Sequence, residues 1–289
     1  MKAKIGLAQI NPTLGDLQRN LEIHRDFIDR GHRSSVDLLI FPELSLTGYF
    51  LKDMVPQVAL RLDSPVVREL EEMSRGISLV IGLVEESEEA LFYNAALYLE
   101  DGAIRHCHRK VYLPTYGLFD EQRYLARGRT VRTFKSRFGQ MAILICEDLW
   151  HVSTVYLAAQ QGADLLLIPA ASPGRGAERG GKLEIAETWE AMNRTYATLF
   201  TMGVCFTNRV GYEDGVNFWG GSEIISPAGE RLLKGNDFEE NLLVGVFDLD
   251  EVRRSRISNT VRRDEDLDLT FRELQRIYRK HFPEGDGDE

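Results

Sequence analysis

The stretch MAILICEDLW, residues 141–150, carries an apolar run directly into a thiol and two acids. Residues 141–145 are typical of a strand that is covered on both faces. Cys146 leaves this strand just ahead of residues 152–161, which have a helical pattern. A sharp turn between a strand and a helix exposes the side chain at its tip, which suits a nucleophile. The stretch therefore predicts an α/β fold with Cys146 at the end of a sheet.

Apolar runs and amphipathic stretches alternate on both sides of this turn. Asp16 suits the N-cap of a helix that Gly31 would end, and Ser64 with Pro65 would begin another. Asp101–Gly102 is a strong signal for a hairpin turn. Further strands are expected at residues 4–10, 37–41, 78–84, 92–99, 164–168, 203–208, 218–225 and 242–247, and helices at 184–200 and 269–278. This mixture of hairpins and helix-crossed strands indicates an α/β protein with a mixed sheet or a pair of sheets.

Length and composition fit one folded domain. The chain has 289 residues, of which 43% are hydrophobic and 28% are charged, enough to bury a substantial core. No linker interrupts the alternation of strands and helices. We predict a single domain over residues 1–282, followed by a disordered tail at 283–289.

Charge and cysteine content indicate which binding partners and which cellular compartment to expect. The net charge of −10 disfavours nucleic acid and anionic membranes as partners. Residues 1–16 lack the long apolar run of a membrane span or a secretory signal. Three cysteines without a CxxC pair disfavour a disulfide framework and a zinc ribbon. We expect a cytoplasmic protein with no nucleic-acid or membrane partner.

Two further polar side chains follow expected strands and are candidates to act with Cys146. Glu43 comes just after the apolar run at 37–41, and Lys110 follows the predicted hairpin. Ligand crevices form at the carboxyl ends of strands in α/β sheets. Partial burial would suit Glu43 to act as the base that deprotonates a thiol, while Lys110 would stabilise an oxyanion. Taken singly, a core thiol, a solvated acid and a surface lysine are the commoner roles.

Three segments together resemble the nitrilase superfamily of carbon–nitrogen hydrolases. They are FPELSLTGY at 41–49, HRKVYLP at 108–114 and ICEDLW at 145–150, in the chain order of that family's Glu–Lys–Cys triad. The resemblance implies a four-layer α–β–β–α sandwich and a cysteine acyl-enzyme mechanism. Glu43 would be the general base, Cys146 the nucleophile, and Lys110 with the Glu147 backbone N–H the oxyanion site. Glu121 would position the lysine, and no metal or organic cofactor is expected.

Within this superfamily, YGLFDEQRYL at 116–125 together with CEDLW is most similar to the glutaminase domains of glutamine-dependent NAD synthetases. The resemblance implies substrate-binding groups at Tyr116, Glu147 and Ser172. Glu147 would pair with a substrate ammonium, and Arg175 or Arg179 is a candidate to hold a substrate carboxylate. A synthetase portion is not recognised in the sequence. We therefore expect either a glutaminase subunit that supplies a separate ammonia-accepting synthetase, or an amidase for another small linear amide.

Other activities stay open at this point. A nitrilase is disfavoured, because Glu147 stands where that activity is associated with tryptophan; an N-carbamoyl amide hydrolase is another alternative. A catalytically idle subunit of an ammonia-using complex is disfavoured, because all three triad residues are present. Similar proteins form dimers through the helices that flank the nucleophile, so we expect a homo-oligomer built from dimers.

A few further side chains are expected to be structural. His106 and His108 share one face of a strand, but no third metal ligand has a supporting spacing. Cys107 and Cys205 are expected in the core. The basic cluster at residues 253–256 is expected to form a solvated surface or a subunit contact.

Overall fold

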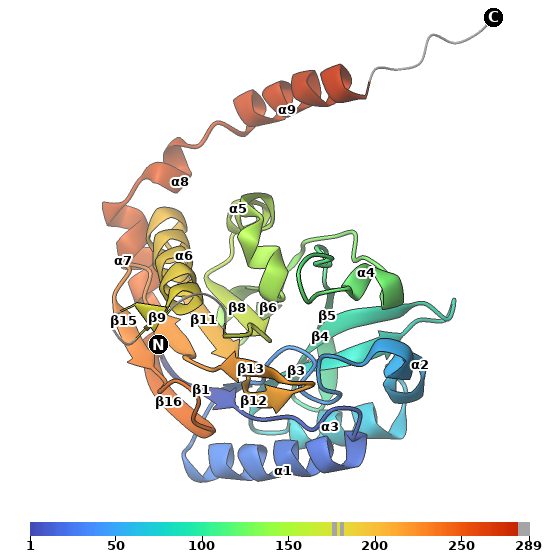
Figure 1. Ribbon diagram of the computed structural model, residues 1–289. Helices are drawn as coiled ribbons and strands as arrows, with labels where there is room; N and C mark the ends of the chain where they lie inside the picture. The colour runs from blue at the N-terminus through green and yellow to red at the C-terminus, as the bar shows by residue number, and fades with distance from the viewer. Residues whose placement is uncertain (175–177, 180–181, 283–289) are drawn as a thin grey trace, which may run out of the picture.

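Two six-stranded mixed sheets hold most of the strands (Figure 1). The computed structural model describes residues 1–174, 178–179 and 182–282. The first sheet has the order β16 (Asn241–Asp248), β1 (Lys2–Gln9), β2 (Leu38–Ile40), β3 (Ser78–Glu86), β4 (Phe92–Glu100) and β5 (Ala103–Arg109). The second has the order β15 (Arg231–Lys234), β14 (Glu223–Ile225), β11 (Gly203–Asn208), β8 (Leu165–Ala170), β7 (Gly139–Ile143) and β6 (Thr133–Ser136). Strands β1, β2 and β3 are parallel, as are β7, β8 and β11.

Helices cover the outer face of each sheet, and the two inner faces pack against each other. Helices α1 (Leu17–Arg33) and α3 (Pro65–Met73) bury Phe27 and Leu70 against the first sheet. Helices α5 (Val152–Gln160) and α6 (Glu184–Phe200) bury apolar side chains such as Trp189 against the second. Between the sheets, Ile5 and Leu167 belong to one shared core. These four layers confirm the predicted α–β–β–α sandwich.

Local sequence signals explain where several helices and strands begin or end. The Asp16 carboxylate accepts the Arg19 N–H at 2.9 Å and caps α1. Residues 101 and 102 both have positive φ and join β4 to β5, which confirms the hairpin. The expected end of α1 at Gly31 is wrong, because the helix continues to Arg33. A Cβ at Gly31 would lie 3.0 Å from Ile77 Cδ1, so this glycine permits close packing instead.

The predicted strand at residues 218–225 is interrupted. Its first part belongs to β13 (Val216–Trp219), which pairs with β12 (Val210–Glu213) in a separate hairpin. Gly220 and Gly221 follow with positive φ, and only then does β14 enter the second sheet. After β14 the chain turns into β15, a strand that the sequence pattern did not indicate.

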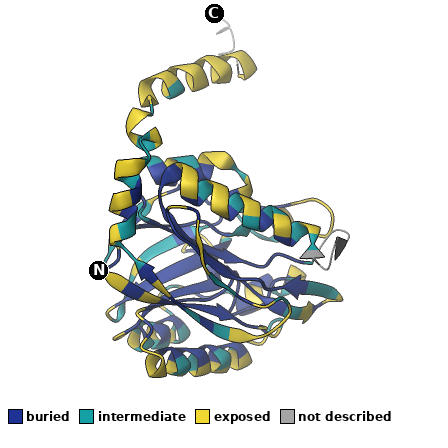
Figure 2. Cartoon of the chain, turned by 90° about the vertical axis from the view of Figure 1, so that its left-hand side faces the viewer, coloured by how far each residue is buried: buried dark blue, intermediate teal, exposed yellow. Residues whose placement is uncertain are grey.

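The C-terminal part of the chain leaves the sandwich. Helix α7 (Asp250–Ser258) still reaches the core, whereas α8 (Val261–Asp264) and α9 (Leu267–His281) extend away from it (Figures 1 and 2). No residue of α9 is buried. The predicted tail at 283–289 lies outside the described residues. Across the part of the chain that the structure describes, no helix combines the length and apolar character needed to span a membrane.

Candidate active site

Cys146 lies at a turn between β7 and α5, as predicted. Its φ is +44°, in the left-handed region that residues with a Cβ seldom adopt. A 3₁₀ segment, Cys146–Trp150, follows and leads to α5. Such strained conformations persist where surrounding contacts fix them, and they cluster at functional sites. The thiol is half-buried at the tip of this turn.

Asp148 ties the Cys146 turn to the segment that carries Lys110. Its Oδ2 accepts the Ile145 N–H at 3.0 Å and lies 2.9 Å from His108 Nε2. Its Oδ1 accepts the next two backbone N–H groups after Lys110, both at 2.9 Å. Asp148 is completely buried, so these bonds replace the hydration of its carboxylate. The end of β7 and the residues after β5 are thereby held together.

Both carboxylate oxygens of Glu43 are held by hydrogen bonds. Oε1 accepts from Lys110 Nζ at 2.6 Å and from Asn94 Nδ2 at 2.7 Å. Oε2 accepts the Ala171 N–H at 2.8 Å. The turn that bears Glu43 lies against β3, where a Cβ at Gly82 would come within 2.5 Å of backbone atoms of this turn. Glu43 is 1% exposed, so its position is set by these contacts.

Lys110 is a buried cation between two carboxylates. Its Nζ lies 2.6 Å from Glu43 Oε1 and 2.6 Å from Glu121 Oε1. Burial alone would lower the pKa of Lys110, but Glu121 and Glu43 outweigh this and raise it well above the ordinary value. Burial raises the pKa of Glu121, with Lys110 opposing and Glu43 adding to the rise. The site therefore keeps a charged ammonium next to the thiol.

The surroundings of Cys146 favour its protonated thiol over the thiolate. Burial, followed by the nearby Glu43 carboxylate, raises the pKa of Cys146 well above its ordinary value. Lys110 and the Ala171 N–H act in the opposite direction. A thiol in this state attacks only if a neighbouring base accepts its proton, and Glu43 is the carboxylate that this arrangement offers.

A cavity of about 220 Å³ opens onto Cys146. Its polar lining is formed by Tyr116, Glu147 and Ser172, the three residues expected at a substrate pocket, and the remaining lining residues are Phe119, Trp150, Pro173, Ile185 and Trp189. Pockets for drug-sized ligands usually measure about 300–1,000 Å³. This cavity therefore suits a smaller molecule.

All three polar groups form hydrogen bonds with neighbouring side chains. The Tyr116 hydroxyl donates to Glu147 Oε2 at 3.0 Å. The Ser172 hydroxyl oxygen accepts from Trp189 Nε1 at 2.8 Å and from Trp219 Nε1 at 3.4 Å. Burial raises the pKa of Glu147, with the Tyr116 hydrogen bond opposing the rise.

Other predicted residues lie away from this cavity. His108 contacts Asp148, and the His106 ring stacks on Phe134 with the ring centroids 4.4 Å apart. Within the described residues, no group of three or more His, Cys, Asp or Glu side chains could hold a metal. Cys205 is completely buried, and Cys107 is half-buried. Arg175 and the side chain of Arg179 lie outside the described residues.

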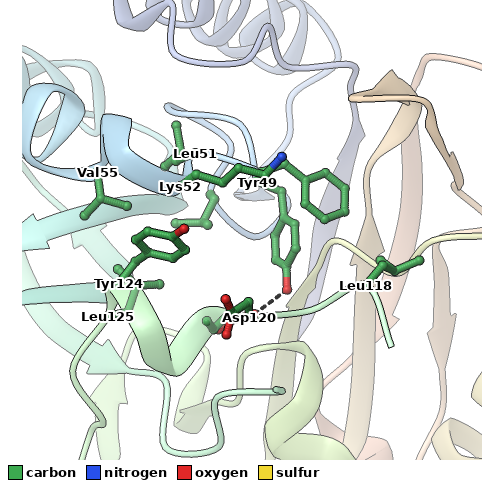
Figure 3. Close-up of a pocket in the computed structure, with 11 residues that line it drawn as sticks. Tyr49, Leu51, Lys52, Val55, Leu118, Asp120, Tyr124 and Leu125 are labelled. Atoms are coloured by element: carbon green, nitrogen blue, oxygen red, sulfur yellow. Dashed lines mark hydrogen bonds between the residues drawn. The ribbon is translucent and has the colours of Figure 1, made fainter. Parts of the chain in front are cut away.

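Tyr49, Asn94 and Asp148 also contribute to this site, although they were not predicted from the sequence. Tyr49 ends the FPELSLTGY segment, yet nothing local indicates that its hydroxyl donates to Glu121 Oε1. That hydrogen bond, drawn dashed in Figure 3, lies beside a second, smaller cavity of about 70 Å³. Apolar side chains, including Leu51, line most of this smaller cavity.

Comparison with known proteins gives consistent similarities. The family described as carbon–nitrogen hydrolase matches residues 4–257. The glutamine-dependent NAD(+) synthetase of Thermotoga maritima is 33% identical over 267 residues, covering 91% of this chain and 45% of that protein. The N-carbamoylputrescine amidase of Oryza sativa is 25% identical, covering 92% of this chain and 93% of that protein.

A solved structure adds chemical detail about a relative. A mutant amidase from Nesterenkonia sp. AN1 is 26% identical, with a TM-score of 0.75, covering 89% of this chain and 97% of that chain. Acrylamide has added to its active-site cysteine. The present chain spans about half the length of the curated NAD(+) synthetases it matches, from 44% to 46% of each.

Proposed function

Because the chain belongs to the carbon–nitrogen hydrolase family, we propose that it hydrolyses a small linear carboxamide to a carboxylic acid and ammonia through a thioester on Cys146. One observation carries this proposal: Glu43, Lys110 and Glu121 form a buried, hydrogen-bonded set beside a thiol that opens onto a small cavity. A base, a fixed cation and a nucleophile are the groups that acyl transfer requires.

The first half-reaction forms the acyl-enzyme. Glu43 accepts the thiol proton, and the Cys146 sulfur attacks the amide carbonyl carbon. The resulting oxyanion is stabilised by the Lys110 ammonium and by the Glu147 backbone N–H. Collapse of this intermediate breaks the C–N bond, and protonated Glu43 returns its proton to the leaving ammonia.

The second half-reaction releases the acid. Glu43, again a carboxylate, takes a proton from a water molecule that attacks the thioester carbonyl. The C–S bond then breaks, and the thiolate recovers the proton from Glu43. Glu121 contributes by holding Lys110 through its 2.6 Å contact, so the cation stays in place during both steps.

The polar lining of the cavity favours a substrate with a cationic group. Glu147 is adjacent to the nucleophile, and its carboxylate would pair with an α-ammonium such as that of glutamine. The glutamine-dependent relatives support this assignment. An N-carbamoyl amide is the second candidate, because a full-length relative is named N-carbamoylputrescine amidase. A nitrile substrate is less favoured, because Glu147 follows the nucleophile at the position where nitrilase activity is associated with tryptophan.

Two partners belong to the proposal. If glutamine is the substrate, a separate synthetase would take up the ammonia; the alternative of an idle subunit in such a complex would retain the fold without activity.

A homo-oligomer is supported by α9, whose stripe of Leu267, Phe271, Leu274 and Tyr278 is more than half exposed at every position. The helix carries a net charge of +2 (four basic, two acidic residues), so the rest of the chain carries −12. A second copy of this acidic chain is therefore the occupant we propose for that face.

The decisive experiment is ammonia release from glutamine, N-carbamoyl compounds and a panel of short amides. We expect release from at least one amide by the parent protein and by a Cys205→Ala control, and none above background by Cys146→Ala. Cys205 is buried away from the cavity, so it tests whether loss of any thiol matters. Equal activity of Cys146→Ala and the parent would overturn the thioester mechanism.

A further inference from the structure

A buried ion pair that the proposed reaction does not use spans β12, with Arg209 just before the strand and Glu213 as its last residue. Arg209 is completely buried, and Glu213 is 5% exposed. Arg209 Nη1 donates to Glu213 Oε2, and Arg209 Nη2 donates to the Pro12 carbonyl at 3.3 Å. Burying two charges is costly unless their polar atoms are well bonded. The remaining bonds of Glu213 indicate what this pair does.

Glu213 fixes the backbone of the segment that contains Tyr49. Its Oε1 accepts the Tyr49 N–H at 2.8 Å and the Phe50 N–H at 2.6 Å. Gly48 makes this approach possible: its φ is +77°, and a Cβ there would lie 2.9 Å from Glu213 Oε2. A side chain at Gly48 would therefore push the carboxylate away from the backbone it holds.

The same ion pair also supports the Tyr49 ring. The Arg209 guanidinium carbon lies 4.2 Å from the centroid of the Phe218 ring. Phe218 in turn packs edge-on against Tyr49, with centroids 6.2 Å apart. Glu213 thus holds the backbone of Tyr49. Arg209 supports the Tyr49 ring through Phe218.

The Tyr49 hydroxyl connects this support to the candidate catalytic groups. It donates to Glu121 Oε1, the same oxygen that accepts from Lys110 Nζ at 2.6 Å. Burial, followed by the charges of Glu121, Glu43 and Cys146, raises the pKa of Tyr49 well above its ordinary value. The hydroxyl therefore remains a proton donor to Glu121.

We propose that Glu213, neutralised by Arg209, is a positioning residue that holds Tyr49 so that its hydroxyl fixes Glu121 and, through Glu121, the Lys110 ammonium beside Cys146. This inference rests on the proposed function, because it assigns Glu213 a task only if Lys110 acts on the thiol or the oxyanion. It adds a residue from a distant hairpin that touches neither the thiol nor the substrate cavity.

The test measures the state of the thiol directly. Iodoacetamide alkylates thiolates, and peptide mass spectrometry follows Cys146 and Cys107 separately in the same sample across the neutral to alkaline pH range. We expect Glu213→Gln and Tyr49→Phe each to slow alkylation of Cys146 about tenfold, the scale of a small misplacement of an active-site group. The pH of half-maximal rate should rise, because a loosened Lys110 stabilises the thiolate less. The Cys107 rate should not change.

A double variant separates positioning from general stability. If Glu213 acts through Tyr49, the pair Glu213→Gln with Tyr49→Phe should be no slower than the slower single variant. Glu223→Gln is the matched control: Glu223 is also a buried glutamate, bonded to Asn193 at 2.9 Å and Arg231 at 3.0 Å, without contact to Tyr49. It should leave the Cys146 rate and midpoint at parental values.

Several results would overturn the inference. A parental rate and midpoint in Glu213→Gln would do so, as would multiplied effects in the double variant or an equal slowing of Cys107 alkylation. If Glu213→Gln does not fold, Glu213→Asp keeps the charge beside Arg209 but shortens the reach to the Tyr49 N–H, and the same outcomes apply to it. Ammonia release by Cys146→Ala tests the proposed function independently, so the two failures are distinguishable.

Discussion

The Asp148 carboxylate lies 2.9 Å from the Nε2 atom of His108, with both side chains almost fully buried. This contact joins the strand before Lys110 to the turn that bears Cys146. Three backbone N–H groups complete the hydrogen bonding of the carboxylate, one before the nucleophile and two after the lysine. The distance between the proposed nucleophile and the proposed oxyanion cation is therefore set largely by one side chain.

Asp148→Asn should damage stability and activity together. The asparagine NH₂ group would face N–H donors, and the buried acceptor capacity would be halved. We expect the free energy of unfolding to fall by about 3 kcal/mol, the range for breaking a buried charged network. We expect the Cys146 alkylation rate to fall at least about tenfold under conditions where the variant is folded. Urea unfolding and iodoacetamide labelling measure the two effects.

Asp164→Asn is the matched control for this change. Asp164 accepts the Gln140 N–H at 2.9 Å and pairs with Arg256, but at the opposite end of β7 from Cys146. We expect this variant to lose stability and to keep the parental alkylation rate. Equal slowing in both variants would mean that the rate reports general loosening of β7 and not the tie made by Asp148.

The parts of the site that could be predicted from sequence are those that a strand end determines. Glu43, Lys110 and Cys146 each follow a predicted strand, and the resemblance supplied the expectation that they meet. The structure brings Glu43 and Lys110 to 2.6 Å and places Cys146 beside them, while their catalytic roles stay predictions. The four-layer arrangement was implied by the resemblance, whereas the alternating patterns alone indicated an α/β protein with a mixed sheet or a pair of sheets.

The parts that sequence could not predict depend on contacts between distant segments. Glu213 bonds the Tyr49 N–H across 164 positions, and nothing near either residue indicates it. The prediction that α1 ends at Gly31 was wrong for a related reason. A glycine after an amphipathic run reads as a helix end, but here the neighbour that requires a small residue is Ile77 on another segment.

Replacement of Glu147 tests the substrate class. Glu147→Gln keeps the shape but removes the charge that would pair with an α-ammonium. A charged hydrogen bond contributes about 1.5–3 kcal/mol, so kcat/KM for glutamine should fall roughly 10- to 100-fold, while that for the uncharged amide butyramide should change little. Steady-state ammonia assays on both substrates give the comparison. Parallel losses on glutamine and butyramide would contradict a role in ammonium recognition.

His24 predicts a pH dependence of stability. Burial lowers the pKa of His24 to about 4, and its ring nitrogens contact the Asn20 carbonyl at 2.7 Å and Ser45 Oγ at 3.0 Å. Above pH 6.5, the ordinary value, the ring is neutral in both states. As pH falls from 6.5 towards 4, the unfolded state takes up a proton that the folded state does not. About 3 kcal/mol of stability should be lost across that window.

His24→Gln should flatten this part of the stability profile, whatever it does to the absolute value. Urea unfolding at a series of pH values between neutral and acidic provides the slope. His32→Gln, at an exposed position on the same helix, is the control that should retain the parental slope. A parental slope in His24→Gln would place the responsible proton uptake elsewhere.

Removal of residues 267–289 should leave the folded chain intact and abolish self-association. No α9 residue is buried, so its loss exposes no core, and we expect the thermal midpoint of the subunit to change little. Cutting at 266 keeps Glu265, which accepts the Tyr156 hydroxyl at 2.6 Å and anchors the preceding segment to α5. Light scattering after size exclusion gives the mass of each form.

In the full chain, Phe271→Asp with Leu274→Asp should reproduce the loss of self-association expected on truncation, whereas Gln275→Asp on the same helix should not. A parent that is monomeric at all concentrations, or a truncated chain of unchanged oligomeric mass, would contradict the assignment of α9 as a contact between copies.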